Sequence, residues 1–262
     1  MRSNALRTVL ESDEPAVCAW LSTDSAYLAE VLGHAGFDAV TVDAQHGMFD
    51  VDRAIGLLQA ASTGPATPMA RVPSLHAPTI GKMLDAGAYG IVCPAVDTAA
   101  DAEAFVRACR YPPAGERSYG PARALLYGGA DYPEHADQAV LSWAMIESAT
   151  ALDNLADIVA TPGLDGVYVG PNDLALSLGE QPGLRQPPPR TMQALRDVAA
   201  AARGAGVYAG AFCLDTAVAV QLVEVGYSLV TPGNDVGMLR AAAADRIAAV
   251  RGRAAAESPA GY

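Results

Sequence analysis

Two acidic residues occupy matching places at the ends of apolar stretches in this chain. Glu147 ends the run Trp143-Ala-Met-Ile-Glu147, and Asp173 ends Val167-Tyr-Val-Gly-Pro-Asn-Asp173. Neighbouring parallel strands lie about 4.8 Å apart, so carboxylates at the same end of two such strands can share a cation. With no His or Cys cluster beside them, these acids suit an oxygen-ligated Mg²⁺ or Mn²⁺ better than a structural Zn²⁺. The alternative is that each acid only interacts with the N-terminus of the helix that follows it.

A third acid lies close to a histidine in the sequence. Asp43 ends the apolar run 37–43, and His46 follows in the same strand-to-loop turn. A carboxylate beside an imidazole can fix its tautomer and raise its basicity, which prepares a general base. The pair taken alone fits a hydrogen-bonded turn without a catalytic role equally well.

Two arginines are candidates for contacts with an anionic substrate. Arg71 directly follows the apolar run Thr67-Pro-Met-Ala70. A guanidinium at the end of a buried strand is costly unless it meets an anion. That anion is either a substrate carboxylate or enolate, or the side chain of Asp43 or Glu147 in a salt bridge. Arg123, in a glycine-rich stretch, is a weaker candidate, with a solvated loop residue as the alternative.

The single lysine bears on the mechanism. Lys82 lies in the segment 78–85, where Ile80, Met83 and Leu84 mark the apolar face of a helix and Lys82 points away from it. Schiff-base chemistry on a carbonyl substrate needs a lysine inside the fold. If this chain stabilises the carbanion of a 2-oxo acid, a metal must therefore act as the electron sink.

These residues lie within a repeating pattern of apolar runs and amphipathic segments. The runs are continuously apolar, as in strands buried on both faces. Glycines fit helix ends just before several strands, and two Thr-x-x-Asp sequences resemble capping boxes that start helices. The predicted strands lie near 16–20, 37–43, 67–72, 90–96, 141–147, 166–171, 207–213 and 227–231; the glycines are Gly36, Gly87, Gly206 and Gly226; the capping sequences begin at Thr98 and Thr150.

Eight strands alternating with helices predict an α/β fold of the (β/α)8 TIM barrel class. Such a barrel takes about 250 residues as one unit, so we expect a single domain over 1–262, with its core at about 15–250 and a mobile tail at 254–262. A doubly wound open sheet would give similar signals, but no G-x-G-x-x-G follows the first strand. Two proline- and glycine-rich stretches, 111–137 and 180–189, are expected to cover the active face of the barrel.

The composition of the chain limits the classes of molecule that it is expected to bind. The formal net charge of −12 argues against nucleic acid, whereas small anionic substrates are compatible with it because a local arginine or metal can attract them. The N-terminus has no apolar targeting segment and no apolar run approaches about 20 residues, so a cytoplasmic protein without a membrane span is expected. Four cysteines without C-x-x-C spacing (Cys18, Cys93, Cys109 and Cys213) are expected to be reduced, mostly as core residues.

Several collinear motifs resemble one known family. They are Gly36-Phe-Asp-Ala-Val-Thr-Val-Asp-Ala-Gln-His46, Ala70-Arg-Val-Pro73, Arg110-Tyr-Pro-Pro-Ala-Gly-Glu-Arg117, Met145-Ile-Glu147 and Gly166-Val-Tyr-Val-Gly-Pro-Asn-Asp173-Leu174. Over roughly residues 15–250 the chain is similar to the class II, metal-dependent pyruvate aldolases of the 4-hydroxy-2-oxoheptanedioate aldolase type, the HpcH/HpaI family.

The resemblance implies roles for the candidate residues. Glu147 and Asp173 would bind a divalent metal (Mg²⁺, Mn²⁺ or Co²⁺), which a 2-oxo acid chelates through its carboxylate and keto oxygens. Arg71 would polarise the keto oxygen, and His46, oriented by Asp43, would serve in proton transfer.

Further contacts concern the substrates and the assembly. Backbone amides around Gly170, Pro171, Asn172 and Asp173 would hold the substrate carboxylate. Many family members carry Glu before the catalytic His, whereas this chain has Gln45, which alters the proton-relay network and the preference for the aldehyde. Phe212 and Leu214, after the seventh strand, are candidates for the wall of the aldehyde pocket. The family implies homo-hexamers, trimers of dimers that exchange the last helix, here 236–253.

The predicted reaction is reversible aldol cleavage of a 4-hydroxy-2-oxo acid to pyruvate, or to a related 2-oxo acid such as hydroxypyruvate, and an aldehyde. One alternative is a metal-dependent oxaloacetate decarboxylase, which uses the same enolate. A non-catalytic, ligand-binding barrel is the other, although such a protein has no physical reason to keep five costly polar groups together.

Overall fold

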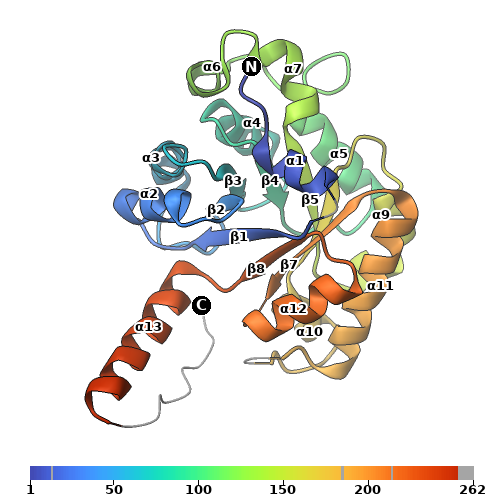
Figure 1. The fold of residues 1–262 in the computed structure, drawn as a ribbon. Helices are drawn as coiled ribbons and strands as arrows, with labels where there is room; N and C mark the ends of the chain where they lie inside the picture. Colours follow the sequence, from blue (N-terminus) through green and yellow to red (C-terminus); the bar gives the residue numbers. More distant parts are fainter. Residues whose placement is uncertain (13, 184–185, 214, 253–262) are drawn as a thin grey trace.

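The strands predicted from the sequence pair in order and close into a barrel. The computed structural model describes residues 1–12, 14–183, 186–213 and 215–252. All neighbouring strands are parallel, and the last pairs with the first (Figure 1). They are β1 (Ala16–Leu21), β2 (Ala39–Asp43), β3 (Thr67–Arg71), β4 (Gly90–Cys93), β5 (Leu141–Ile146), β6 (Gly166–Val169), β7 (Tyr208–Cys213) and β8 (Leu229–Pro232). The predicted (β/α)8 barrel is confirmed.

Helices surround the barrel. They are α1 (Ala5–Glu11), α2 (Ala26–His34), α3 (Val51–Ala61), α4 (Ala77–Asp85), α5 (Ala99–Cys109), α6 (Ala122–Gly128), α7 (Tyr132–Ala139), α8 (Ala149–Asp153), α9 (Leu155–Val159), α10 (Pro171–Ser177), α11 (Pro189–Ala205), α12 (Thr216–Val225) and α13 (Asp235–Val250). Thr98 and Asp101 form the predicted capping box of α5. The box expected at Thr150 is wrong, because α8 starts earlier and Ser148 caps it.

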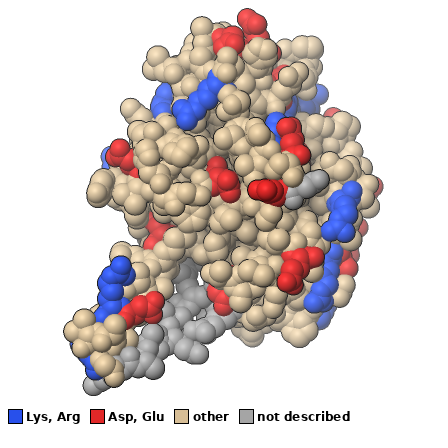
Figure 2. Space-filling view, viewed as in Figure 1, with Lys and Arg blue, Asp and Glu red and all other residues tan. Residues whose placement is uncertain are grey.

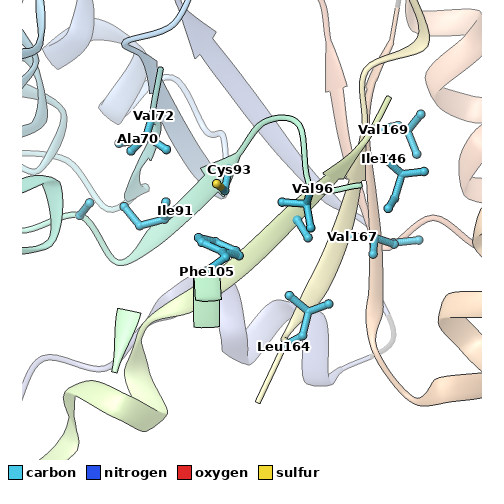
Figure 3. Close-up of a cluster of buried hydrophobic side chains, with 14 of the residues drawn as sticks. Ala70, Val72, Ile91, Cys93, Val96, Phe105, Ile146, Leu164, Val167 and Val169 are labelled. Carbon is cyan, nitrogen blue, oxygen red and sulfur yellow. The ribbon is translucent and has the colours of Figure 1, made fainter. Parts of the chain in front are cut away.

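Side chains alternate between the inside of the barrel and the surrounding helices. Trp20, Met69, Trp143 and Tyr168 belong to the cluster inside the barrel. The residues between them on each strand face outward and pack on the helices, as Figure 3 shows for β4 to β6 and Phe105 of α5. Both faces of every strand are thus buried, which is why the strands read as continuous apolar runs.

The same alternation carries polar side chains into the carboxyl end of the barrel. Asp43, Arg71 and Glu147 follow the inward-facing Ala39, Met69 and Met145, respectively, by an even number of residues. Their side chains therefore face inward as well. Asp43 and Arg71 are also direct register partners of β2 and β3. The strand period therefore places these three residues on one side of one end of the barrel, where active sites of this fold lie.

The amino end of the barrel is closed by α1, α6 and α7. Leu6 and Leu10 of α1 join the inner cluster. The Asn4 side chain donates to the carbonyls of Tyr89 (3.0 Å) and Ala139 (2.7 Å). In Figure 1 the N-terminus, α6 and α7 lie together at the top of the view.

The prediction that 111–137 covers the active face is therefore wrong. This stretch follows α5, which returns the chain to the amino ends of the strands, and it forms α6 and α7 there. Arg117 of the stretch bonds Asp85 at 2.9 Å, at the end of α4. The second stretch, 180–189, includes residues outside the described ranges; its Glu180 bonds Thr191 at the start of α11.

The last described helix, α13, projects away from the barrel (Figure 1). Asp235, at its start, accepts hydrogen bonds from the backbone of Ser22 (3.0 Å) and Thr23 (3.1 Å), which follow β1. Leu239 and Val250, farther along, are exposed. The expected helix exchange stays a prediction, and the tail 254–262 lies outside the described residues.

The cysteines and the surface agree with the composition. All four cysteines are free and buried, and burial raises the pKa of Cys18 to about 11 and that of Cys213 to about 12. Acidic and basic side chains are interspersed on the face that Figure 2 shows. Within the described residues, no helix is both long and apolar enough to cross a membrane.

Candidate active site

Arg71 and Asp43 form a buried, two-point ion pair at the carboxyl end of β2 and β3. Arg71 donates from Nε to Oδ1 of Asp43 at 2.8 Å and from Nη2 to Oδ2 at 2.6 Å. The Arg71 side chain is 3% exposed and that of Asp43 is 0% exposed. The salt bridge to Asp43, one of the alternatives for Arg71, is thus present. It holds the plane of the guanidinium rather than leaving it to rotate.

Asp43 also organises the loop that follows β2. Its carboxylate accepts the indole N–H of Trp20 at 3.1 Å and the backbone N–H groups of Gln45 and His46 at 3.1 and 3.2 Å. Burial by itself raises the pKa of Asp43, but the hydrogen bonds and charge of Arg71 and the other donors outweigh it, so the pKa is lowered. Asp43 is therefore an anion at neutral pH.

His46 lies in the exposed part of this loop. The hydrogen bond from His46 to Asp43 is made by the backbone N–H of His46. It therefore fixes the backbone of this residue and not the orientation of its imidazole ring. Gly47 tightens the same turn: a Cβ there would lie 2.3 Å from the carbonyl oxygen of Asp43. Orientation of the imidazole by Asp43 stays a prediction.

Glu147 follows β5 at the same end of the barrel. Its Oε1 accepts the backbone N–H of Ala95 at 2.8 Å, and Ala95 has a positive φ of 54°. Burial raises the pKa of Glu147, and the nearby charge of Asp173 raises it further, against the opposing effects of the Ala95 bond and Arg71. A Cβ on Gly170 would lie 3.0 Å from Oε2 of Glu147, so a larger residue there would displace this carboxylate by a few tenths of an ångström.

A small cavity of about 20 Å³ joins these elements. It is lined by Trp20, Arg71, Met145, Tyr168, Gly170, Pro171, Asn172, Asp173 and Phe212. Its apolar wall is ordered by ring contacts, with Trp20 stacked on Tyr168 at 5.6 Å and edge-on to Phe212 at 5.8 Å. The cavity thus brings together predicted residues from β3, β7 and the start of α10.

The acids present fit a divalent metal. Within the described ranges, no cluster of three or more His, Cys, Asp or Glu side chains could hold a metal ion. Glu147 and Asp173 would therefore supply two carboxylates, and water and substrate would complete the octahedron that hard cations prefer. Repulsion between these acids contributes to the raised pKa of Glu147, and a cation between them would relieve it.

Some expected residues lie elsewhere. Arg123 is at the amino end of the barrel, where it donates to the Ala86 carbonyl and the Ser62 hydroxyl, so its prediction as a substrate contact is wrong. Arg123 belongs to α6, which forms at the amino end as described above. Leu214 lies outside the described residues. Lys82 is on the exposed side of α4, as predicted.

Three wall residues, Trp20, Met145 and Tyr168, are not among the site residues predicted from the sequence. Their signal was present in the strand period, because each is an inward residue of its strand. A larger cavity, about 380 Å³, lies near the amino ends of β7 and β8 and is lined by residues such as Glu14, Arg203 and Tyr227. It contains none of the candidate residues, and we place the site at the carboxyl end.

Comparison with known proteins identifies the family. The model of the HpcH/HpaI aldolase/citrate lyase family matches residues 17–242. The chain belongs to this family. A hydroxypyruvate/pyruvate aldolase of Rhizorhabdus wittichii is 38% identical to it, over 95% of this chain and 99% of that protein. A 4-hydroxy-2-oxo-heptane-1,7-dioate aldolase of Klebsiella pneumoniae is 36% identical, over 90% of each.

A solved structure gives the same result for the fold. The crystal structure of an HpcH/HpaI aldolase/citrate lyase family protein from Burkholderia cenocepacia J2315 superposes with a TM-score of 0.88 at 36% identity, covering 95% of this chain and 100% of that one. The resemblance inferred from the motifs is therefore confirmed, and this member of the HpcH/HpaI family is an enzyme, an aldolase-type carbon–carbon lyase.

Proposed function

We propose that this enzyme catalyses the reversible, metal-dependent aldol cleavage of a 4-hydroxy-2-oxo acid to an aldehyde and pyruvate, or a related 2-oxo acid such as hydroxypyruvate. The observation that carries the proposal is the cavity shared by Arg71 and Asp173, with Glu147 against Gly170 beside it. The names of the two enzymes compared above support the same reaction class.

Glu147 and Asp173 would hold Mg²⁺, Mn²⁺ or Co²⁺. When bound, the metal draws electrons from the carboxylate and keto oxygens of the 2-oxo acid. The negative charges of Glu147 and Asp173 repel each other, and a cation bound between them would relieve this repulsion.

Arg71 would bind the keto oxygen and stabilise its negative charge as the bond between C3 and C4 breaks. The electron pair of that bond passes to C3, and the product is an enolate. Because Asp43 binds two N–H groups along one edge of the guanidinium, the positive charge of Arg71 is already in place before the substrate arrives. A preorganised charge is more effective than one that must reorient during the reaction.

His46 would take the proton of the 4-hydroxyl group during cleavage and return a proton in the reverse direction. The backbone bonds of Gln45 and His46 to Asp43 hold the loop that presents the imidazole. Backbone N–H groups of Gly170, Asn172 and Asp173 would bind the substrate carboxylate, and Pro171, which has no backbone N–H, would line the cavity between them. Phe212 would form an apolar wall toward the aldehyde, with Gln45 as a neutral neighbour.

The assembly is part of the proposal. Leu239 and Val250 leave apolar surface on the projecting α13, and packing α13 on a second chain would bury it. We expect trimers of dimers, with a solution mass near that of six chains by light scattering. The cytoplasmic location expected from the sequence also stays a prediction.

The decisive experiment is hydrogen–deuterium exchange at the methyl group of pyruvate, followed by NMR in deuterated buffer. Chelator-treated protein should exchange at the background rate, and added Mg²⁺, Mn²⁺ or Co²⁺ should restore exchange. The absence of exchange with every metal, in protein shown to be folded by circular dichroism, would contradict the enolate mechanism for this donor. Rates on a 4-hydroxy-2-oxo acid and on oxaloacetate then distinguish aldol cleavage from decarboxylation.

A further inference from the structure

One oxygen in the wall of the active-site cavity is buried without a hydrogen bond. Asn172 lines the cavity beside Arg71 and Asp173. Its Oδ1 is shielded from solvent and accepts no hydrogen bond from the described residues. A buried acceptor left unsatisfied is costly, so its presence in a substrate cavity calls for a donor from outside the chain.

Two aromatic residues of the wall, Trp20 and Tyr168, have committed their polar hydrogens elsewhere. The indole N–H of Trp20 is donated to Asp43 at 3.1 Å. The hydroxyl of Tyr168 is donated to Thr231 at 2.7 Å. Met145 and Phe212, which also line the cavity, have no polar hydrogen in their side chains. The wall around Asn172 is therefore largely unable to satisfy this oxygen.

The chemistry of the substrate limits what could satisfy it. The carboxylate and keto oxygens of a 2-oxo acid are only acceptors at neutral pH, and the methyl group of pyruvate donates no ordinary hydrogen bond. Hydroxypyruvate differs from pyruvate by one hydroxyl group on C3, next to the keto carbon that Arg71 would hold. Its O–H is a donor of the kind that the oxygen of Asn172 lacks.

We infer that Asn172 is a specificity residue that accepts a hydrogen bond from the C3 hydroxyl of the donor substrate. This inference rests on the proposed aldolase function and goes beyond it, since it makes hydroxypyruvate the preferred donor over pyruvate. A site built to bond a hydroxyl discriminates against an analogue that lacks it, because its buried polar group is then left unpaired.

The test compares hydroxypyruvate with pyruvate in the metal-loaded enzyme and in two variants, with one common aldehyde. In Asn172→Ala the ratio of kcat/KM for hydroxypyruvate to that for pyruvate should fall about tenfold, through the hydroxypyruvate value. The aspartate in Asn172→Asp can still accept a hydrogen bond but cannot donate one. This variant should therefore keep the wild-type ratio of the two kcat/KM values, even if its negative charge slows the reaction of both 2-oxo acids. Titration calorimetry with each acid should show the same selective loss in Asn172→Ala.

Ser177→Ala is the matched control. Ser177 is at the other end of α10, where its hydroxyl accepts the backbone N–H of Ala149, and it does not line the cavity. This variant should keep the wild-type ratio. If Asn172→Ala lowers kcat/KM equally for hydroxypyruvate and pyruvate, or leaves their ratio unchanged, the inference is overturned. A water molecule would then be the partner of the Asn172 oxygen. Loss of the ratio in Asn172→Asp would mean that the amide donates instead. Failure of wild-type enzyme on both donors would count against the proposed function itself.

Discussion

Asp43 and Arg71 lie opposite each other on adjacent strands and share two hydrogen bonds with almost no solvent contact. Neither side chain can be considered alone. A buried ion pair contributes little net stability, but removing one partner leaves the other as an uncompensated buried charge. The ion pair therefore links the stability of this end of the barrel to the position of the Arg71 guanidinium, which is proposed to bind the enolate.

Arg71→Met should abolish pyruvate methyl exchange and destabilise the protein by about 3–5 kcal/mol, since Asp43 loses its counter-ion. Urea unfolding measures the stability. The control is Asp43→Asn combined with Arg71→Met, which should regain a large part of the stability without regaining exchange. Mn²⁺ affinity, measured by calorimetry, should remain near wild type in the folded single variant, because Arg71 is not a proposed ligand. Unchanged exchange in Arg71→Met would rule out the role given to this residue.

The stability difference between wild type and Arg71→Met should depend on pH. The pKa of Asp43 in the folded protein is lowered, so Asp43 contributes stability above its unfolded pKa of about 3.9, and this is lost as the pH falls through the lower folded value. In the variant burial acts alone and raises the pKa of Asp43, which penalises folding at neutral pH. The difference in unfolding free energy should therefore be largest near pH 7 and shrink below about pH 4. A difference that grows on acidification would contradict this account.

Metal binding should be governed by Glu147. Its pKa is raised above the ordinary 4.5, and protons compete with a metal for a carboxylate, so Mn²⁺ affinity should begin to fall at a pH above 4.5. Glu147→Gln should weaken Mn²⁺ binding by at least about tenfold, since even residues that only support a ligand cost 10–100-fold. Paramagnetic resonance of free Mn²⁺ provides the titration. The comparison variant is Glu180→Gln, which changes an acid that bonds Thr191 in the first turn of α11, and equal affinity loss there would argue against a specific site.

Lys82→Met should leave turnover unchanged, because Lys82 is exposed on α4. Borohydride added with pyruvate should likewise not inactivate the enzyme, as no lysine lies inside the barrel to form a Schiff base. Mass spectrometry of the treated protein checks for a reduced adduct. An adduct on Lys82 accompanied by loss of activity would refute the metal-only mechanism.

The barrel could be predicted from the sequence because its signals are local. Continuous apolar runs report burial on both faces, and the two-residue period then places Asp43, Arg71 and Glu147 inside. The choice between substrate and salt bridge for Arg71 stayed open, since it depends on the register of β2 against β3, which no local pattern contains.

The position of the 111–137 stretch could not be predicted for a related reason. Its glycines and prolines indicate turns but not the end of the barrel on which they fold. Long-range bonds such as Arg117 to Asp85 decide that. The unsatisfied oxygen of Asn172 is likewise invisible in the sequence, because it results from what the surrounding residues do with their own hydrogens.

The closure of the amino end has a consequence for how the chain is made. Asn4 bonds carbonyls of Tyr89 and Ala139, and Arg7 forms a salt bridge with Asp165. The first helix can contact β1 and Thr67 soon after they are made. The bonds to Ala139 and Asp165, in contrast, can form only after more than half of the polypeptide has been synthesised, so the earliest segment of this enzyme completes its contacts late in translation.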